Sequence, residues 1–217
     1  MSKKKGSHKK QLYHKILEKI IRLGFPRDIF LTEGALAEEL NVSRVSIRET
    51  LITLCNEQIL KNVPRIGYQI VQLTTHDIND AFRTRTILEI GAAREYLPKL
   101  TDYQFETLLE KVEPTFEVIK RINSPIEEWW AGNMQFHLSI ARLAGNELLA
   151  DMLRKTLDII WRANIQFFAN KEPDNYLKFN MGGHEAILES IKTRDLKSLN
   201  ENLIQDIGSL KPIFQVL

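Results

Sequence analysis

Apolar side chains recur every three to four residues in three stretches near the start of the chain, a spacing that places them on one face of a helix. The helices expected from this pattern are residues 11–23, 33–40 and 44–58. Pro26 follows the first stretch and stops it, because proline lacks the backbone N–H that a helix uses. Thr32 and Ser43 directly precede the second and third stretches and are suited to cap them.

Two short apolar stretches follow, at residues 59–63 and 68–73, and they flank the turn Pro64-Arg65-Ile66-Gly67. Short strand-like runs on either side of such a turn predict a β-hairpin. Three helices, a tight turn at residues 39–43 and a hairpin together form the outline of a winged helix-turn-helix, in which the hairpin is the wing.

From residue 75 onward the pattern is almost entirely helical. Amphipathic stretches predict helices at about residues 77–97, 102–121, 125–144, 147–169, 175–193 and 195–215. Short loops between them predict an antiparallel bundle of six to seven helices. The expected fold class is therefore mainly all-α, with a DNA-binding domain at residues 1–73, whose residues 1–10 form a basic flexible tail, and a helical domain at residues 74–217.

Charge is divided unevenly between these two parts. Residues 1–73 hold 13 lysines and arginines against seven aspartates and glutamates, a net charge of +6, whereas residues 74–217 carry −4. This split is expected if only the first part meets a polyanion, although a surplus of this size also arises by chance. A single cysteine excludes an internal disulfide. No secretory signal and no run of 18 apolar residues occurs, which predicts a cytoplasmic protein that spans no membrane.

The third predicted helix has the features of a DNA-recognition helix. Arg44 and Arg48 lie one turn apart at its start, the part that enters the major groove, and arginine can donate two hydrogen bonds to guanine. Ser43 and Ser46 can bond phosphates or base edges, and Arg65 lies at the hairpin tip. A solvated helix face is the alternative for each arginine taken alone, but the combination favours DNA.

One run of residues carries a family resemblance. It consists of Phe30-Leu31-Thr32-Glu33, Leu36-Ala37-Glu38-Glu39-Leu40-Asn41-Val42-Ser43-Arg44, Arg48-Glu49-Thr50-Leu51 and Val63-Pro64-Arg65 with Gly67. The run resembles the N-terminal domain of GntR-type bacterial transcription regulators. The resemblance implies a homodimer on a palindromic operator in double-stranded DNA, and it places Ser43, Arg44, Ser46, Arg48 and Gly67 at the DNA.

Gly34 departs from that pattern, because family members often carry an arginine at this position, where it touches DNA. We expect a different or less demanding operator and not a loss of DNA binding. Operator preference that stays unchanged in Gly34→Arg would contradict this expectation.

The helical part is similar to the ligand-binding domain of the FadR-like subgroup of these regulators. The matching segments are Phe82-Arg83-Thr84-Arg85-Thr86-Ile87-Leu88-Glu89, Asn133 with Phe136-His137, Ala144-Gly145-Asn146, and His184-Glu185-Ala186-Ile187-Leu188. In many relatives a metal inside the bundle is held by an aspartate, a histidine four residues later and two further histidines. The positions that match these ligands are Asn133, His137, His184 and Asp206, so two of the four residue types differ.

Two interpretations of this cluster stay open. Two imidazoles, one carboxylate and one amide oxygen can hold a divalent ion such as Zn, Ni or Mn, with reduced affinity because an amide is a poor ligand. Alternatively, the four groups form a metal-free polar pocket that bonds an effector. Arg85 either binds the carboxylate of a small organic-acid effector or forms a salt bridge with a residue such as Glu89. Trp129, Trp130 and Trp161 either line the cavity or belong to the core.

The sequence therefore predicts a transcription regulator that responds to a small carboxylate, and not an enzyme. Repression is the commoner outcome in such regulators. A glycine-rich phosphate loop and an HExxH motif are both absent. Two alternatives remain: a metal-dependent, hydrolase-like enzyme that uses His137, His184 and Asp206, and an architectural DNA-binding protein whose bundle only dimerises.

Overall fold

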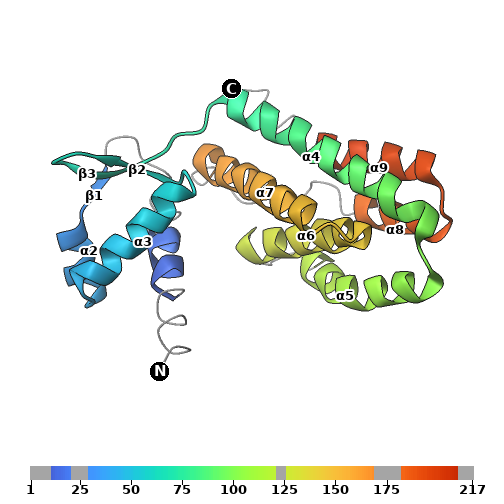
Figure 1. Cartoon of the computed structure of the whole chain (residues 1–217), viewed down its shortest axis with the longest axis horizontal. Helices are drawn as coiled ribbons and strands as arrows, with labels where there is room; N and C mark the ends of the chain where they lie inside the picture. Colours follow the sequence, from blue (N-terminus) through green and yellow to red (C-terminus); the bar gives the residue numbers. More distant parts are fainter. Residues whose placement is uncertain (1–10, 21–28, 121–125, 169–181, 210–217) are drawn as a thin grey trace. The chain divides into compact units, whose positions relative to one another are not determined.

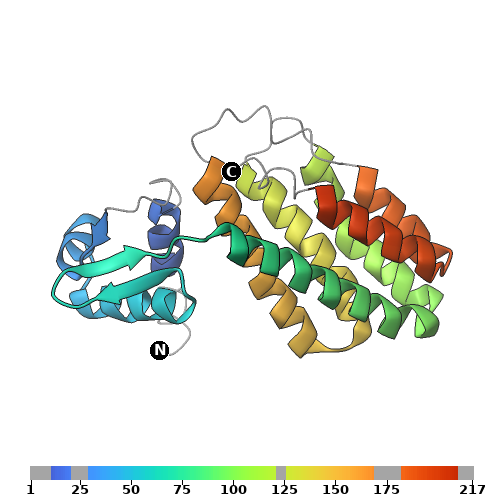
Figure 2. The ribbon, with the colours of Figure 1, turned by 90° about the horizontal axis from the view of Figure 1, so that it is seen from above.

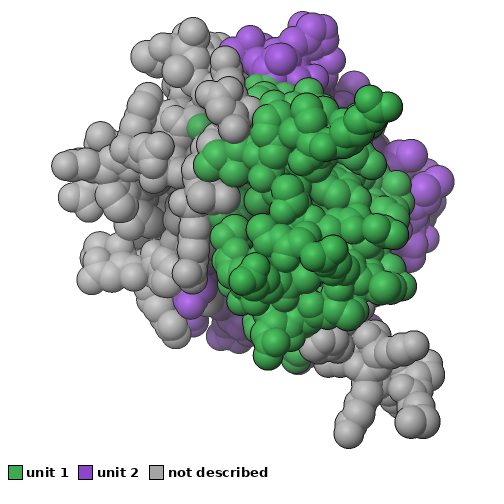
Figure 3. Space-filling model, turned by 90° about the vertical axis from the view of Figure 1, so that its left-hand side faces the viewer, with its two compact units in different colours: residues 1–73, 164–171 green, residues 74–163, 172–217 purple. Residues whose placement is uncertain are grey.

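The structure of the chain is a computed structural model that describes residues 11–20, 29–120, 126–168 and 182–209 (Figure 1). The chain divides into two compact units, coloured separately in Figure 3. The first unit comprises residues 1–73 and 164–171, and the second comprises residues 74–163 and 172–217.

The first unit contains three helices around one apolar core. Residues 11–20 are helical, α2 spans Glu33–Leu40 and α3 spans Arg44–Asn56. The buried side chains of these helices are Leu12, Ile16, Ile20, Leu36, Ile47, Leu51 and Leu54. They recur at the three- to four-residue spacing of an amphipathic helix, as the apolar pattern predicts. In α2 only Leu36 is buried, whereas Ala35 is exposed and Leu40 is half-buried.

Local capping sets where α2 and α3 begin. The backbone N–H of Ala35 donates to the Thr32 hydroxyl, and the N–H of Ser46 donates to the Ser43 hydroxyl. Between the helices, Asn41 adopts a left-handed conformation (φ 51°) and closes the tight turn.

A small antiparallel sheet completes this unit. Strand β2 (Leu60–Val63) pairs with β3 (Gly67–Ile70), which confirms the predicted hairpin. A third strand, β1 (Phe30–Leu31), pairs with the other edge of β3, so the strand order is β1-β3-β2 among the described residues. The sequence pattern did not predict β1, because two residues are too short to show an alternation.

Gly67 is what lets β1 approach β3 so closely. Its φ is +140°, and a Cβ placed there would lie 2.5 Å from the Leu31 carbonyl oxygen. Side chains other than hydrogen do not fit such a contact. Gly67 thus has a packing role that is independent of any contact with DNA.

The second unit is a bundle of helices. Those among the described residues are α4 (Thr75–Tyr96), α5 (Asp102–Lys120), α6 (Ile126–Ala141), α7 (Glu147–Phe168), α8 (Gly182–Lys192) and α9 (Leu196–Ser209). Two short 3₁₀ turns, η1 (Leu97–Lys99) and η2 (Arg142–Ala144), extend α4 and α6. Helix α4 packs on α6 and α9, α5 on α6, and α8 on α9 (Figure 2). This arrangement confirms the predicted helical bundle.

Several sequence expectations lie outside the described residues. They concern the basic tail at 1–10, the end of the first helix at 21–23, and the helix segments at 121, 125, 169, 175–181 and 210–215. Within the described ranges, no helix is long and apolar enough to cross a membrane.

Candidate DNA-contact surface and buried polar cluster

Helix α3 presents one buried face and one polar face. Ile47, Thr50, Leu51 and Leu54 are buried, whereas Arg44 and Arg48 are exposed. The hydroxyls of Ser43 and Ser46 lie 2.9 Å apart at the start of the helix. All four predicted side chains of this helix start are therefore gathered at one helix N-terminus, which favours anions such as phosphate.

Arg48 already has an ionic partner within the first unit. Its Nε and Nη2 each donate to a carboxylate oxygen of Glu33 at a distance of 2.8 Å. Glu33 also accepts from the Tyr68 hydroxyl at 3.2 Å. The Arg48 hydrogen bond holds the pKa of Glu33 below its usual value. Since 63% of the Arg48 side chain is exposed, this pair contributes little to stability and orients the guanidinium. Sequence reasoning named Glu33 only as part of the run that carries the family resemblance and assigned it no role.

Arg44 lies against the start of α2. A Cβ at Gly34 would meet the Arg44 guanidinium at 3.7 Å. This distance is an ordinary van der Waals contact, so a side chain at position 34 would begin next to the Arg44 guanidinium.

The remaining predicted DNA residues lie in the wing. Arg65 is exposed in the turn between β2 and β3, with a φ of +68°, and Gly67 begins β3. Tyr68, the residue after Gly67, links the hairpin to α3 through its hydrogen bond to Glu33, which in turn holds Arg48.

A cluster of polar side chains lies inside the second unit, centred on Arg85 of α4. The Arg85 side chain is 0% exposed. Its Nε donates to Glu89 Oε1 at 2.6 Å, and its Nη2 donates to Asp206 Oδ2 at 2.9 Å and lies 2.7 Å from His137 Nε2. The salt bridge to Glu89 that the sequence left open is therefore present, and it is buried.

Four helices contribute to this cluster. His137 of α6 contacts Glu89 through Nδ1 at 2.8 Å, and Asn133 lies one turn earlier on the same helix, also buried. His184 of α8 stacks on Phe136, with ring centroids 3.9 Å apart, and its Nε2 lies 3.6 Å from Asp206 Oδ1 of α9. The bundle thus buries all four positions that the family resemblance matched to metal ligands.

The charges of the cluster support one another. Burial raises the pKa of Asp206 and of Glu89, but His137 and Arg85 outweigh it and hold both values below their usual range. Burial and the neighbouring His137 lower the pKa of His184 to about 3, so this ring is neutral at pH 7.

His137 has two arrangements open to it. Burial lowers its pKa, but Glu89 and, more weakly, Asp206 outweigh this and raise the value overall. A protonated ring donates to both carboxylates, whereas the short contact with Arg85 requires an unprotonated Nε2, because a guanidinium can only donate. The state of His137 is therefore coupled to the position of Arg85.

Three buried nitrogen atoms of the cluster have no hydrogen-bond partner among the described residues: Arg85 Nη1, Asn133 Nδ2 and His184 Nδ1. Arginine and amide N–H groups are donors only, so the first two lack an acceptor. An unpaired buried donor costs about 1–3 kcal/mol, which an oxygen-bearing ligand would recover.

Three side chains of the cluster could hold a metal ion. His137, His184 and Asp206 offer ligand atoms that lie within 4.8 Å of one another. The contact between His137 Nδ1 and Glu89 is of the kind that orients metal-binding histidines. These donor types fit a divalent cation, and Arg85 Nη2 contacts two of the same residues.

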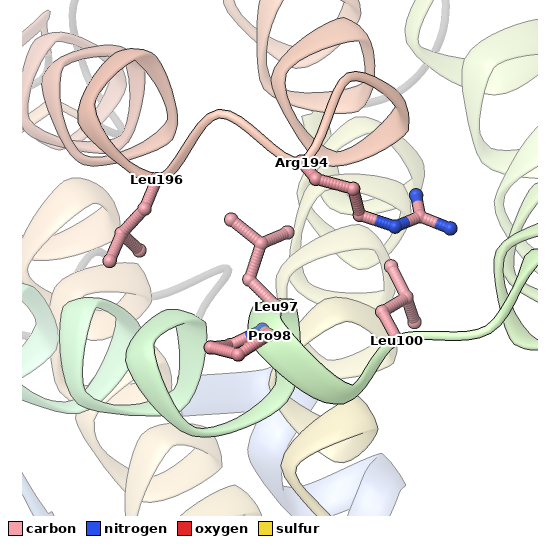
Figure 4. A pocket seen from close by; sticks show the side chains of 5 residues that line it. All are labelled: Leu97, Pro98, Leu100, Arg194 and Leu196. Carbon is pink, nitrogen blue, oxygen red and sulfur yellow. The ribbon is translucent and has the colours of Figure 1, made fainter.

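A separate hollow of about 380 Å³ lies at the far end of α4, lined by Leu97, Pro98, Leu100, Arg194 and Leu196 (Figure 4). Arg194 donates to Asp102 Oδ1 and to the Ile191 carbonyl, each at 2.8 Å. Its charge is therefore already engaged, and the other lining residues are apolar. This hollow suits a carboxylate less well than the buried cluster does.

The tryptophans behave mainly as core residues. Trp129 and Trp130 are buried, and Trp130 stacks on Trp161 with ring centroids 5.5 Å apart. This stacking joins α6 to α7.

Two family models match the chain. The model of the FCD domain matches residues 80–206, and that of bacterial regulatory proteins of the gntR family matches residues 8–70. The gluconate operon transcriptional repressor of Bacillus licheniformis is 25% identical over 190 residues, which cover 85% of this chain and 77% of the repressor. The Uxu operon transcriptional regulator of Escherichia coli K12 is 24% identical over 197 residues, covering 82% and 75%.

Solved structures share the fold. A GntR transcriptional regulator from Rhodococcus sp. RHA1 superimposes with a TM-score of 0.72 at 16% identity, covering 97% of this chain and 99% of that one. E. coli McbR/YncC has a TM-score of 0.71 at 18% identity, covering 96% and 97%. The chain therefore belongs to the gntR family of bacterial regulatory proteins, as a transcription regulator whose winged helix-turn-helix is followed by an FCD effector-binding domain.

Proposed function

We propose that this regulator is a homodimeric repressor that binds a palindromic operator and releases it when a small carboxylate enters the cluster around Arg85. The observation that carries the effector part is the pair of buried, unpaired donors, Arg85 Nη1 and Asn133 Nδ2. A carboxylate supplies two acceptor oxygens and a negative charge, which is what a guanidinium binds best. Two relatives are named as repressors of a gluconate operon, and gluconate is a small organic acid.

The DNA part rests on the start of α3 and on the wing. Arg44 and Arg48 are exposed there, and Glu33 holds Arg48 in one orientation. We assign base contacts to the two arginines, phosphate or base contacts to Ser43 and Ser46, and backbone or minor-groove contacts to Arg65 and Gly67. The dimer places two such surfaces on half-sites about 34 Å apart. We expect a regulator with this role to act in the cytoplasm.

Control of DNA binding follows from a population shift. Helix α4 carries Arg85 in its third turn and begins at Thr75, two residues after Leu73, where the N-terminal segment of the first unit ends. A ligand that repositions Arg85 acts on the helix that is covalently continuous with that unit. Small changes in the spacing of two reading heads are enough to prevent both from binding at once.

A metal has a defined place in this proposal. His137, His184 and Asp206 are the side chains that would hold it, with Asn133 as a weaker oxygen donor, and Zn, Ni or Mn suits such a set. When bound, the ion would act as a Lewis acid that can coordinate an oxygen of the effector.

We propose no catalytic role for the cluster. Glu89 and Asp206, its two carboxylates, both accept from Arg85 and contact His137, which is typical of a buried ion-pair network. Family membership also favours regulation over catalysis.

Asn133→Leu tests the effector site. The substitution removes an unpaired donor at little cost to the fold, so the melting temperature without ligand should not fall. Thermal shift and calorimetry against gluconate and other small hydroxy and sugar acids should find an acid that binds the wild-type chain, and the variant should bind it about tenfold more weakly. The control is Asn79→Leu on the exposed start of α4. Equal affinity in wild type and Asn133→Leu would remove the cluster as the site.

A further inference from the structure

We propose that the Arg85 guanidinium is the cation that neutralises the buried cluster. A divalent ion can bind His137 and Asp206 only after this guanidinium has moved away from them. The inference rests on the proposed function only in locating the effector site. It predicts that this chain keeps its bundle folded without a metal and that Arg85 sets the metal affinity.

The first argument is the lone pair of His137. A neutral imidazole has one unprotonated nitrogen with one lone pair in the ring plane. When His137 is neutral and its Nδ1–H donates to Glu89 at 2.8 Å, Nε2 is the nitrogen that can accept, and Arg85 Nη2 lies 2.7 Å from it. A zinc ion bonded to the same nitrogen would lie about 2.0–2.1 Å along the same lone pair. Both partners cannot occupy it together.

The second argument is Asp206. Its Oδ2 accepts from Arg85 Nη2 at 2.9 Å and lies 3.2 Å from His137 Nε2. The Nη2 amino group of Arg85 thus contacts both side chains that would contribute a nitrogen and an oxygen to the ion. The guanidinium is held there by a second bond, from Nε to Glu89 Oε1 at 2.6 Å.

The third argument is charge. Glu89 and Asp206 are both buried, and each forms an ion pair with Arg85. The cluster therefore contains its own compensating cation, and a divalent ion added beside an unmoved guanidinium would be repelled in a site with little water. Asn133, at the position where relatives carry an aspartate, offers no charge to offset this repulsion.

Metal titration of an Arg85 variant tests the inference. Tag-free protein is stripped with EDTA and titrated by calorimetry with Zn²⁺ and, separately, with Ni²⁺. Arg85→Met removes the guanidinium and keeps an unbranched side chain of similar length. It should bind one ion per chain about tenfold or more tightly than the wild type. Arg83→Met, on the exposed face of the same helix, is the matched control and should bind as the wild type does.

A second readout separates competition from a general loosening of the bundle. At the same zinc concentration, the melting temperature of Arg85→Met should rise more than that of the wild type. Adding His137→Ala to Arg85→Met should abolish the gain in affinity. If Arg85→Met fails to fold because two buried carboxylates lose their partner, Arg85→Met combined with Glu89→Gln restores the balance of charge and should show the same gain.

Two results would overturn the inference. One is equal metal affinity in the wild type and in both Arg85 variants. The other is wild-type protein that retains one ion per chain and loses thermal stability when EDTA removes it. Neither measurement uses an operator or an effector, so a failure here leaves the proposed regulation standing, and a failure of operator binding leaves this inference standing.

Discussion

Arginine side chains play two different roles in the two units. Arg48 of the first unit is 63% exposed and paired with a single carboxylate, whereas Arg85 of the second unit is buried between two. An exposed pair exchanges readily with water and with other anions, so Arg48 can give up Glu33 for a base. A buried pair is costly to break, so we expect Arg85 to move only for a ligand that replaces the hydrogen bonds and the charge that it would lose.

Arg44→Ala and Arg48→Ala should each weaken operator binding by roughly 5- to 150-fold and relax the base preference at one position of each half-site. The loss follows from bidentate contacts to guanine, which neither serine nor the wing can replace. Fluorescence anisotropy with single-base operator variants measures both effects. Operator affinity that stays the same in both variants would remove α3 as the recognition helix.

His184 should make the fold sensitive to acid. Its pKa is about 3 in the folded chain because the ring is buried beside His137, whereas an unfolded histidine takes up a proton near pH 6.5. Below pH 6.5 the unfolded state therefore binds more protons, and stability falls as the pH falls. From pH 7.5 to pH 5 this one group should cost about 2 kcal/mol.

Urea unfolding at pH 7.5 and pH 5, in the presence of EDTA, measures that loss. His184→Phe is the matched variant, because a phenyl ring can keep the stacking on Phe136 and has no proton to bind. The variant should lose about 2 kcal/mol less than the wild type over the same interval. An identical loss in both proteins would show that His184 does not cause the pH dependence.

At the scale of elements, features set by residues close together in the sequence were predicted better than features that depend on pairing between distant residues. Thr32 and Ser43 cap the helices that follow them because a cap depends on residues three positions away. Strand β1 was not predicted because its two residues form a strand only by pairing with β3, which lies more than 30 residues later. The role of Glu33 was not predicted for the same reason, since it joins α2 to α3 and β3.

The buried cluster shows the same limit. The spacing of Arg85 and Glu89 predicted their salt bridge as one of two choices, because residues four apart meet on a helix. Only the family resemblance indicated that Asp206, 121 residues from Arg85, belongs to this cluster. Nothing in the sequence indicated which nitrogen atoms stay unpaired, because that depends on how four helices pack.

A pair of glycine substitutions tests the close approach of β1 and β3. Gly67→Ala should destabilise the chain by about 1–3 kcal/mol, because the new Cβ would strain the backbone and meet the Leu31 carbonyl oxygen. Gly91→Ala, in the interior of α4 with open space around it, should stabilise the chain by about 0.5–1 kcal/mol. Denaturant unfolding measures both changes. Two alanine variants of equal stability would contradict this description of the strand pair.

At the scale of the whole molecule, function requires that the two units communicate. The first unit carries α3, the proposed recognition helix, and the second carries the buried cluster. Helix α4 begins at Thr75, after β3 of the first unit has ended at Ile70. The Thr74 capping box fixes the start of that helix: its hydroxyl accepts from the Asp77 N–H, and its own N–H donates to Asp77 Oδ2. A ligand that shifts Arg85 thus acts on a helix whose first turn is well defined.

The most direct test of this account is operator affinity measured with and without the acid that binds the wild-type chain. The DNA is the region upstream of the gene that encodes the regulator, and the method is fluorescence anisotropy at fixed salt. Saturating acid should weaken operator binding of the wild type by about 5- to 150-fold. Asn133→Leu should need about ten times as much acid for the same effect. Operator affinity that does not respond to an acid shown to occupy the cluster would contradict the account.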